Sequence, residues 1–267
     1  MQLSLASKRA RIAAAGAALA VGAGLYTAGA ASAEHSVPRT DKEIPNLTKV
    51  TDKIKAYYGD TVDKDGQHYA SPDSNYAKQV ADIEKKAKAQ LEKAVRNQSG
   101  SGKKGAAKPA IVLDVDDTTL LTYNYELQQG FHFTPESQDA YLKSTDMGPV
   151  FGMPQLVNWA QSKGITVFYV TGRDEHQRDW SVRNLKNAGY KPAADTAHFY
   201  LKNKKTPPAY LPCGAKCTTV EYKAGTRKHI ESQGYRIIGN FGDQYSDLQG
   251  GYAQHTYKLP NPMYFLP

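Results

Sequence analysis

Three carboxylates crowd the end of an apolar, β-branched run. Residues 110–113 (Ala-Ile-Val-Leu) and Val115 indicate a buried parallel strand, and Asp114, Asp116 and Asp117 lie at its carboxyl end. Burying acids costs free energy unless a cation or hydrogen bonds compensate them. Because side chains alternate along a strand, Asp114 and Asp116 point to the same side. An EF-hand is excluded because its glycine and terminal glutamate are absent here.

A second strand end carries groups that suit phosphate oxygens. The apolar run 165–170 is followed by Thr171, Gly172 and Arg173, which offer a hydroxyl, an accessible amide and a cation. Together they can bind the phosphoryl group of a substrate. Taken alone, however, a threonine before a glycine is more often an ordinary helix cap.

A third set of polar residues completes the chemistry. Asp243 and Asp247 stand four residues apart after another apolar run, the first directly after Gly242, and can form half of a site for a hard cation. Upstream, Lys223 opens a predicted helix and can neutralise both a carboxylate and a phosphoryl group. By itself this lysine would be interpreted as a solvated surface residue.

Alternating strands and helices must bring these residues together. Strands are predicted at 110–115, 165–170, 197–201 and 236–240, with helices at 156–162, 174–188 and 223–232. This alternation predicts an α/β fold, a three-layer Rossmann-like parallel sheet with helices on both faces. Ligands of such sheets bind beyond the carboxyl ends of the strands, which is where the polar residues lie.

The residues before this core form an extension. Helices are predicted at 46–58 and 74–97, the second with a clear apolar stripe, and a Ser/Gly/Lys-rich linker at 98–108. We therefore divide the chain into a signal peptide, 1–33, an N-terminal helical extension with linker, 34–108, and a core, 109–267.

The first 33 residues have the pattern of a signal peptide. A positive segment precedes an Ala/Gly-rich run that ends in Ala31-Ser32-Ala33, so cleavage is favoured over an uncleaved membrane anchor. We expect a secreted protein with no stable membrane association afterwards. Losing the three cations of this segment lowers the net charge from +8 to +5, which favours small anionic substrates over a nucleic-acid polymer.

The two cysteines lie in one short stretch. In an exported chain, Cys213 and Cys217 favour a local disulfide that stiffens a surface loop. A zinc site would need two more ligands nearby, and neighbouring residues do not supply them.

In this order and spacing, the four polar elements resemble the haloacid dehalogenase (HAD) superfamily. The resemblance covers nearly all of residues 46–267. Further stretches look like its secreted acid phosphatase branch (subfamily IIIB), which also contains plant acid phosphatases and vegetative storage proteins. Those stretches are 167–173, Arg178, 184–185, 189–190, 222–223, 242–248 and 258–264.

The resemblance implies a role for each residue. Asp114 would be the nucleophile, and Asp116 the acid for the leaving alcohol and then the base for water. Thr171 and the Gly172 amide would bind the phosphoryl oxygens, whose charge Lys223 would neutralise. Mg²⁺ would be held by Asp114, the Asp116 backbone carbonyl and Asp243, with Asp247 in a supporting role. These roles meet the needs of phosphoryl transfer through a covalent intermediate.

The expected function is therefore secreted, Mg²⁺-dependent acid phosphatase activity on small phosphomonoesters. Alternatives are a storage or binding protein on the same fold, a phosphotransferase, and a dehalogenase, which has no need for the second aspartate or the metal pair. Residues 121–152 are too few for a large cap domain. Their aromatic side chains would either pack under the N-terminal helices or stack on a leaving group, and His132 is the histidine to test there.

Overall fold

The computed structural model describes residues 37–99, 107–193 and 195–267. The predicted signal peptide, 1–33, and most of the predicted linker lie outside these residues. Residues up to Val50 form one unit, whose described part contains the single turn η1 (Asp41–Glu43) and the start of α2 (Leu47–Tyr58). Residues from Thr51 onwards form the second unit, which contains the sheet and the polar strand ends.

A five-stranded parallel sheet organises the second unit. Its order is β5-β4-β3-β6-β7. The strands are β3 (Lys108–Leu113), β4 (Thr166–Asp174), β5 (Phe199–Lys202), β6 (Tyr235–Gly242) and β7 (Thr256–Lys258). The central strand β3 pairs on both sides, with Leu113 opposite Tyr169 of β4 and Phe241 of β6. The carboxyl ends of β3, β4 and β6 therefore lie at one edge of the sheet.

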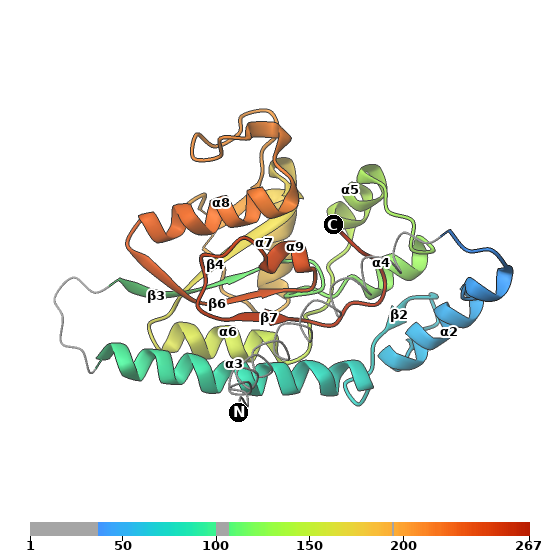
Figure 1. Cartoon of the computed structure of the whole chain (residues 1–267). Coiled ribbons are helices and arrows are strands. Elements are labelled where there is room, and N and C mark those ends of the chain that lie inside the picture. Colours follow the sequence, from blue (N-terminus) through green and yellow to red (C-terminus); the bar gives the residue numbers. More distant parts are fainter. Residues whose placement is uncertain (1–36, 100–106, 194) are drawn as a thin grey trace, which may run out of the picture. The chain divides into compact units, whose positions relative to one another are not determined.

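Helices cover both faces of the sheet. Figure 1 shows α3 (Asn75–Ser99) and α6 (Met153–Ser162) along one face and α8 (Thr219–Ser232) along the other. Leu91 of α3 packs where Gly239 of β6 lacks a side chain. On the α8 side, Val112 and Ile230 belong to one apolar cluster. A strand buried on both faces must be apolar throughout, which explains the run that begins at residue 110. The predicted fold class is confirmed.

The segment between β3 and β4 forms short helices, and its described residues form no large cap domain. These helices are α4 (Tyr123–Gln128) and α5 (Pro135–Ser144), and α6 follows them. Tyr123 is buried and stacks on Tyr58 of α2, with ring centroids 4.5 Å apart, and Phe151 contacts Tyr76 of α3. These aromatic side chains pack under the N-terminal helices, as one of the two interpretations predicted. His132 is exposed.

Several predicted boundaries were wrong. The helix predicted from Asp174 is α7 (Arg178–Asn187), because β4 runs on to Asp174 and the turn η2 (Glu175–Gln177) intervenes. The helix predicted from Lys223 begins four residues earlier, since Thr218 and Glu221 form a capping box. Lys223 therefore lies in the second turn of α8.

The remaining elements are short. They are the β1–β2 hairpin (Thr61–Val62 and His68–Tyr69), η3 (Gly214–Lys216) and α9 (Tyr245–Leu248). A disulfide joins Cys213 and Cys217 around η3, in agreement with the favoured interpretation of the two cysteines. Within the described residues, every helix is too short or too polar to cross a membrane.

A partly buried acid, Glu84, lies where α3 meets the start of α6 on one face of the sheet. The carboxylate of Glu84 in α3 lies against Gly152, the N-cap of α6, so closely that a Cβ atom there would overlap it. Gly152 also has a φ of 74°, which favours glycine. Burial raises the pKa of Glu84 from its ordinary 4.5 to about 7.

This environment predicts a pH-dependent loss of stability. A carboxyl group whose pKa is raised on folding stabilises the protein fully below pH 4.5, and this contribution is lost as the pH rises through about 7. We expect Glu84→Gln to remove that loss and to stabilise the protein by roughly 1–2 kcal/mol at pH 8, after allowance for partial exposure. Urea unfolding at pH 5 and pH 8 measures the effect. The exposed Asp82→Asn on the same helix is the control, and equal pH dependence in the Glu84 variant and the native chain would contradict the prediction.

Candidate active site

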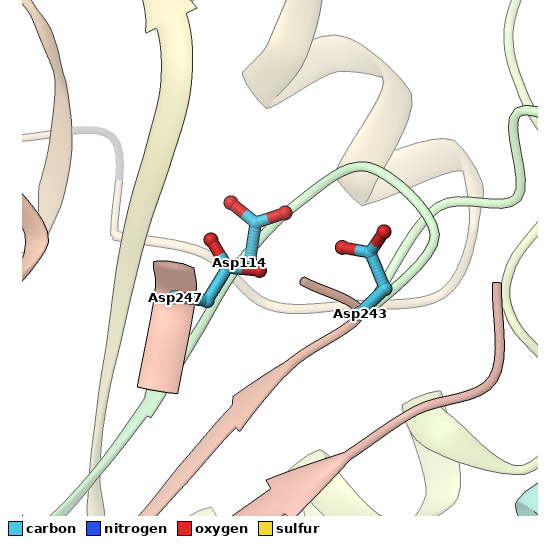
Figure 2. A group of neighbouring side chains, drawn as sticks. All are labelled: Asp114, Asp243 and Asp247. Carbon is cyan, nitrogen blue, oxygen red and sulfur yellow. The ribbon is translucent and has the colours of Figure 1, made fainter. Parts of the chain in front are cut away.

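Three buried aspartates meet at the carboxyl edge of the sheet. Asp114 directly follows β3, Asp243 directly follows β6, and Asp247 lies in α9. Each offers one carboxylate oxygen, and these three oxygens lie within 4.8 Å of one another. Figure 2 shows the three side chains extending from their separate segments into one region. The sequence therefore predicted a cluster that the fold assembles from positions more than a hundred residues apart.

Lys223 is the cation that contacts this cluster. Its Nζ donates to Asp114 Oδ1 and to the carbonyl oxygen of Val170 at 2.7 Å, and forms an ion pair of 2.8 Å with Asp247 Oδ1. Although burial would lower the pKa of Lys223, Asp114 and Asp247 together raise it above its ordinary value. The ammonium is thus kept charged, and it connects Val170 of β4 to the acids that follow β3 and β6.

One ammonium does not balance three carboxylates. Burial raises the pKa of Asp114 well above its ordinary value, although Lys223 opposes the rise. Burial and the neighbouring Asp247 also raise the pKa of Asp243, to about 7. A divalent cation among these oxygens would offset the repulsion and keep Asp114 ionised. The donor set of hard carboxylate oxygens fits Mg²⁺, which prefers one or two carboxylates together with water and phosphate oxygens.

Asp116 is held by a planar, bidentate ion pair. Arg173 donates from Nη2 to Oδ1 at 2.6 Å and from Nε to Oδ2 at 3.0 Å, and its Nη1 donates to Ser181 at 2.8 Å. The Arg173 side chain is fully buried, whereas that of Asp116 is 18% exposed. Arg173 was predicted to bind substrate. Its contacts within the chain orient Asp116, and its role toward a substrate stays a prediction.

The residues predicted to bind phosphate, Thr171 and Gly172, lie in the second half of β4. Thr171 is buried and its Oγ1 accepts from the Arg173 backbone N–H at 3.2 Å, while Gly172 is exposed. Because the preceding residue, Val170, contacts Lys223, this part of β4 lies beside the acidic cluster. An accessible glycine amide next to a buried threonine can receive phosphoryl oxygens.

A fourth buried acid escaped the sequence argument. Asp117 has a φ of 51°, unusual outside glycine, and its carboxylate accepts from the backbone N–H of Thr122 at 3.1 Å and the hydroxyl of Tyr264 at 2.8 Å. Asn261 donates to both Asp117 and Asp243. Burial raises the pKa of Asp117 to about 7, against these hydrogen bonds. In the sequence, Asp117 is one of three crowded acids, and no local pattern indicates its distant partners.

The backbone that carries Asp247 is also fixed by buried polar groups. Arg227 donates to the carbonyl oxygens of Asp247 (2.6 Å) and Gly251 (2.8 Å), and Asn240 donates to that of Asp247 at 3.0 Å. A Cβ atom at Gly242 would overlap the Asp247 side chain, so only glycine allows this approach. One signal for Arg227 was present in the sequence, because it follows Lys223 by four residues and shares its helix face.

Comparison with known protein families assigns the chain to one of them. The sequence model of the HAD superfamily, subfamily IIIB (acid phosphatase), matches residues 19–267. The chain belongs to this family. The predicted family, a subfamily of acid phosphatases, is thereby confirmed.

The individual relatives share about a third of their aligned residues with this chain. Acid phosphatase 1 of Solanum lycopersicum is 33% identical over 159 residues, covering 58% of each chain. Vegetative storage protein 1 of Arabidopsis thaliana is 30% identical over 162 residues, covering 58% of this chain and 55% of that protein. The chain thus spans less than two thirds of the length of these relatives. The class C acid phosphatase of Bacillus anthracis has a similar fold, with a TM-score of 0.52 and 22% identity over 68% of this chain and 78% of that chain.

Proposed function

We propose that this chain is a secreted, Mg²⁺-dependent acid phosphatase that hydrolyses small phosphomonoesters through an aspartyl-phosphate on Asp114. The observation that carries the proposal is the cluster of Asp114, Asp243 and Asp247 at the carboxyl edge of the sheet, with Lys223 paired to Asp114 and Asp247. Membership of the acid phosphatase subfamily supports it. Secretion rests on the leader pattern of residues 1–33.

In the first step, a carboxylate oxygen of Asp114 attacks phosphorus and the bond from phosphorus to the ester oxygen breaks. Asp116 donates a proton to the departing alkoxide, which leaves as the alcohol. Lys223 neutralises charge on the phosphoryl oxygens, and the hydroxyl of Thr171 and the amide of Gly172 hold those oxygens in place. The Arg173 guanidinium keeps Asp116 in one orientation during this transfer.

In the second step, water attacks the phosphorus of the aspartyl-phosphate. Asp116, now ionised, accepts the proton of this water, and the Asp114 carboxylate leaves as inorganic phosphate forms. Asp114, Asp243, Asp247 and the carbonyl of Asp116 would hold Mg²⁺. When bound, the ion supplies Lewis-acid stabilisation of the phosphoryl charge.

Similarity to a vegetative storage protein favours a second candidate, a storage or binding protein without turnover. That function needs no nucleophile, no proton donor and no buried cation site, whereas Asp114, Asp116, Lys223 and Asp243 are all present here. A phosphotransferase uses the same residues and differs only in the acceptor, which is an alcohol instead of water.

Removal of the metal tests the proposed function. We expect release of phosphate from nucleoside, sugar and aryl monophosphates in the presence of Mg²⁺, and a fall of about 10²-fold or more after chelation, because the cluster then lacks its cation. Added Mg²⁺ should restore the rate. An added alcohol that takes the phosphoryl group would identify a phosphotransferase. Absence of release with every ester and with Mg²⁺ would favour the storage protein.

A further inference from the structure

Residues 259–266, which we call the strap, run beside the acidic cluster. The backbone N–H of Leu259 donates to the carbonyl of Gly242 at 2.9 Å. Further along, Leu266 donates from its backbone to the Gln244 side chain at 3.1 Å and accepts from Ser246 Oγ at 3.1 Å. The strap is therefore tied at both ends to the segment that carries Asp243 and Asp247. Part of it was noted in the sequence as a family stretch, and the proposed mechanism gives it no role.

Asn261 is the strap residue that reaches the cluster. Its Nδ2 donates to Asp243 Oδ2 at 2.8 Å and, at a longer 3.4 Å, to Asp117 Oδ2. Its Oδ1 accepts from the backbone N–H of Met263 at 2.8 Å. This second hydrogen bond fixes the orientation of the amide, because only a carbonyl oxygen can accept there. The N–H group must then face the two carboxylates.

The two oxygens of Asp243 consequently differ. Oδ2 accepts from Asn261 at 2.8 Å and from Gln244 Nε2 at 2.7 Å. Oδ1 receives, among the described residues, a hydrogen bond from the Thr118 hydroxyl that is long at 3.4 Å. Two amide donors thus satisfy one oxygen and hold the carboxylate plane, which leaves the other oxygen available to a cation.

Asp117 is held from the same side. Tyr264 of the strap donates its hydroxyl to Asp117 Oδ2 at 2.8 Å, and Asn261 contacts the same oxygen. The strap therefore separates two buried like charges by placing donors between and beside them. Without these donors, repulsion between Asp117 and Asp243 would act on the orientation of Asp243.

We propose that Asn261, supported by Tyr264, is a positioning residue that holds Asp243 in the orientation that binds the divalent cation. This inference rests on the proposed function, since it concerns the cation of that site. Groups that hydrogen-bond to metal-ligating carboxylates set their orientation, and their loss typically weakens metal binding by about 10- to 100-fold.

The test measures metal affinity itself. Isothermal titration with Mg²⁺ should give an apparent Kd that is about tenfold higher for Asn261→Ala than for the native chain. Turnover of an aryl phosphate at saturating Mg²⁺ should return close to the native value, because the catalytic groups are intact. Thermal unfolding of both chains without Mg²⁺ identifies a structural defect separately, because bound metal would also stabilise a variant that is merely destabilised. Phe265→Ala, an exposed strap residue with 67% of its surface accessible, is the matched control and should leave the Kd unchanged.

A second variant keeps the test independent of folding. Tyr264→Phe retains the ring and removes only the hydroxyl, so it should fold and raise the Kd, by less than Asn261→Ala does, because Tyr264 contacts Asp117 and not Asp243. A native Kd in both variants would overturn the inference and leave the proposed function intact. Failure of the native chain to bind Mg²⁺ would overturn the proposed function, and the inference with it.

Discussion

Replacement of Asp114 by asparagine will lower phosphate release by about 10⁴-fold or more, while the protein stays folded. The amide has nearly the same volume as the carboxylate but is not nucleophilic, so the covalent intermediate cannot form. The substitution also removes one of three buried like charges. We therefore expect the melting temperature to stay equal or to rise, although Lys223 loses one partner.

Single-turnover and steady-state phosphate release measure the loss, with thermal unfolding recorded on the same samples. Asp179→Asn, an exposed acid in the first turn of α7, is the matched control and should keep native turnover. If the Asp114 variant released phosphate at a rate comparable to the native chain, another group would have to be the nucleophile and the proposed mechanism would fail.

Replacement of Lys223 by methionine will affect both turnover and stability. The ammonium contacts Asp114, Asp247 and the carbonyl of Val170, so its removal leaves buried acids and a buried acceptor without their donor. We expect kcat to fall by about 10³-fold, the size typical of a lost charge-stabilising donor. Removing one partner of a buried ion pair costs about 3–5 kcal/mol of stability. Saturating Mg²⁺ should reduce this cost, because the cation takes over part of the compensation.

Urea unfolding with and without Mg²⁺, together with kcat, separates the two effects. Lys228→Met, which alters an exposed lysine of the same helix, should change neither quantity. Turnover within about threefold of native in the Lys223 variant would show that this cation does not act on the phosphoryl group.

The sequence was most informative where an apolar strand ends directly in a reactive side chain. The apolar run before Asp114 had to be a doubly covered strand, and the parallel arrangement then required its end to meet the end of the run before Asp243. The three-residue strand β7 is too short to show a comparable apolar pattern. It forms by pairing with β6, a contact that its own residues do not indicate. The predicted start of α8 was wrong, although Thr218 and Glu221 have the spacing of a capping box.

Tertiary partners of the acids could not be predicted from local pattern. Asn261 and Asp117 are 144 residues apart, and neither is marked by spacing relative to the other. Arg173 was predicted to bind substrate, and in the structure it contacts Asp116. A cation near a strand end can face either a substrate or a carboxylate of the chain, and the sequence does not distinguish the two. Only the register between β3 and β4 brings Asp116 within its reach.

The order of the strands has a consequence for how the chain can come apart. Strands β3, β4 and β5 form one half of the sheet from a continuous segment, and β6 with β7 completes the other edge of β3. Asp114 belongs to the first half, and Asp243 with Asp247 to the second. The acidic cluster thus lies across the boundary between β3 and β6, and the repulsion that Lys223 leaves uncompensated acts to separate these two strands. A divalent ion bound by Asp114 on one side and Asp243 on the other would hold the two strands together, so the catalytic ion would also suppress partial opening of the sheet.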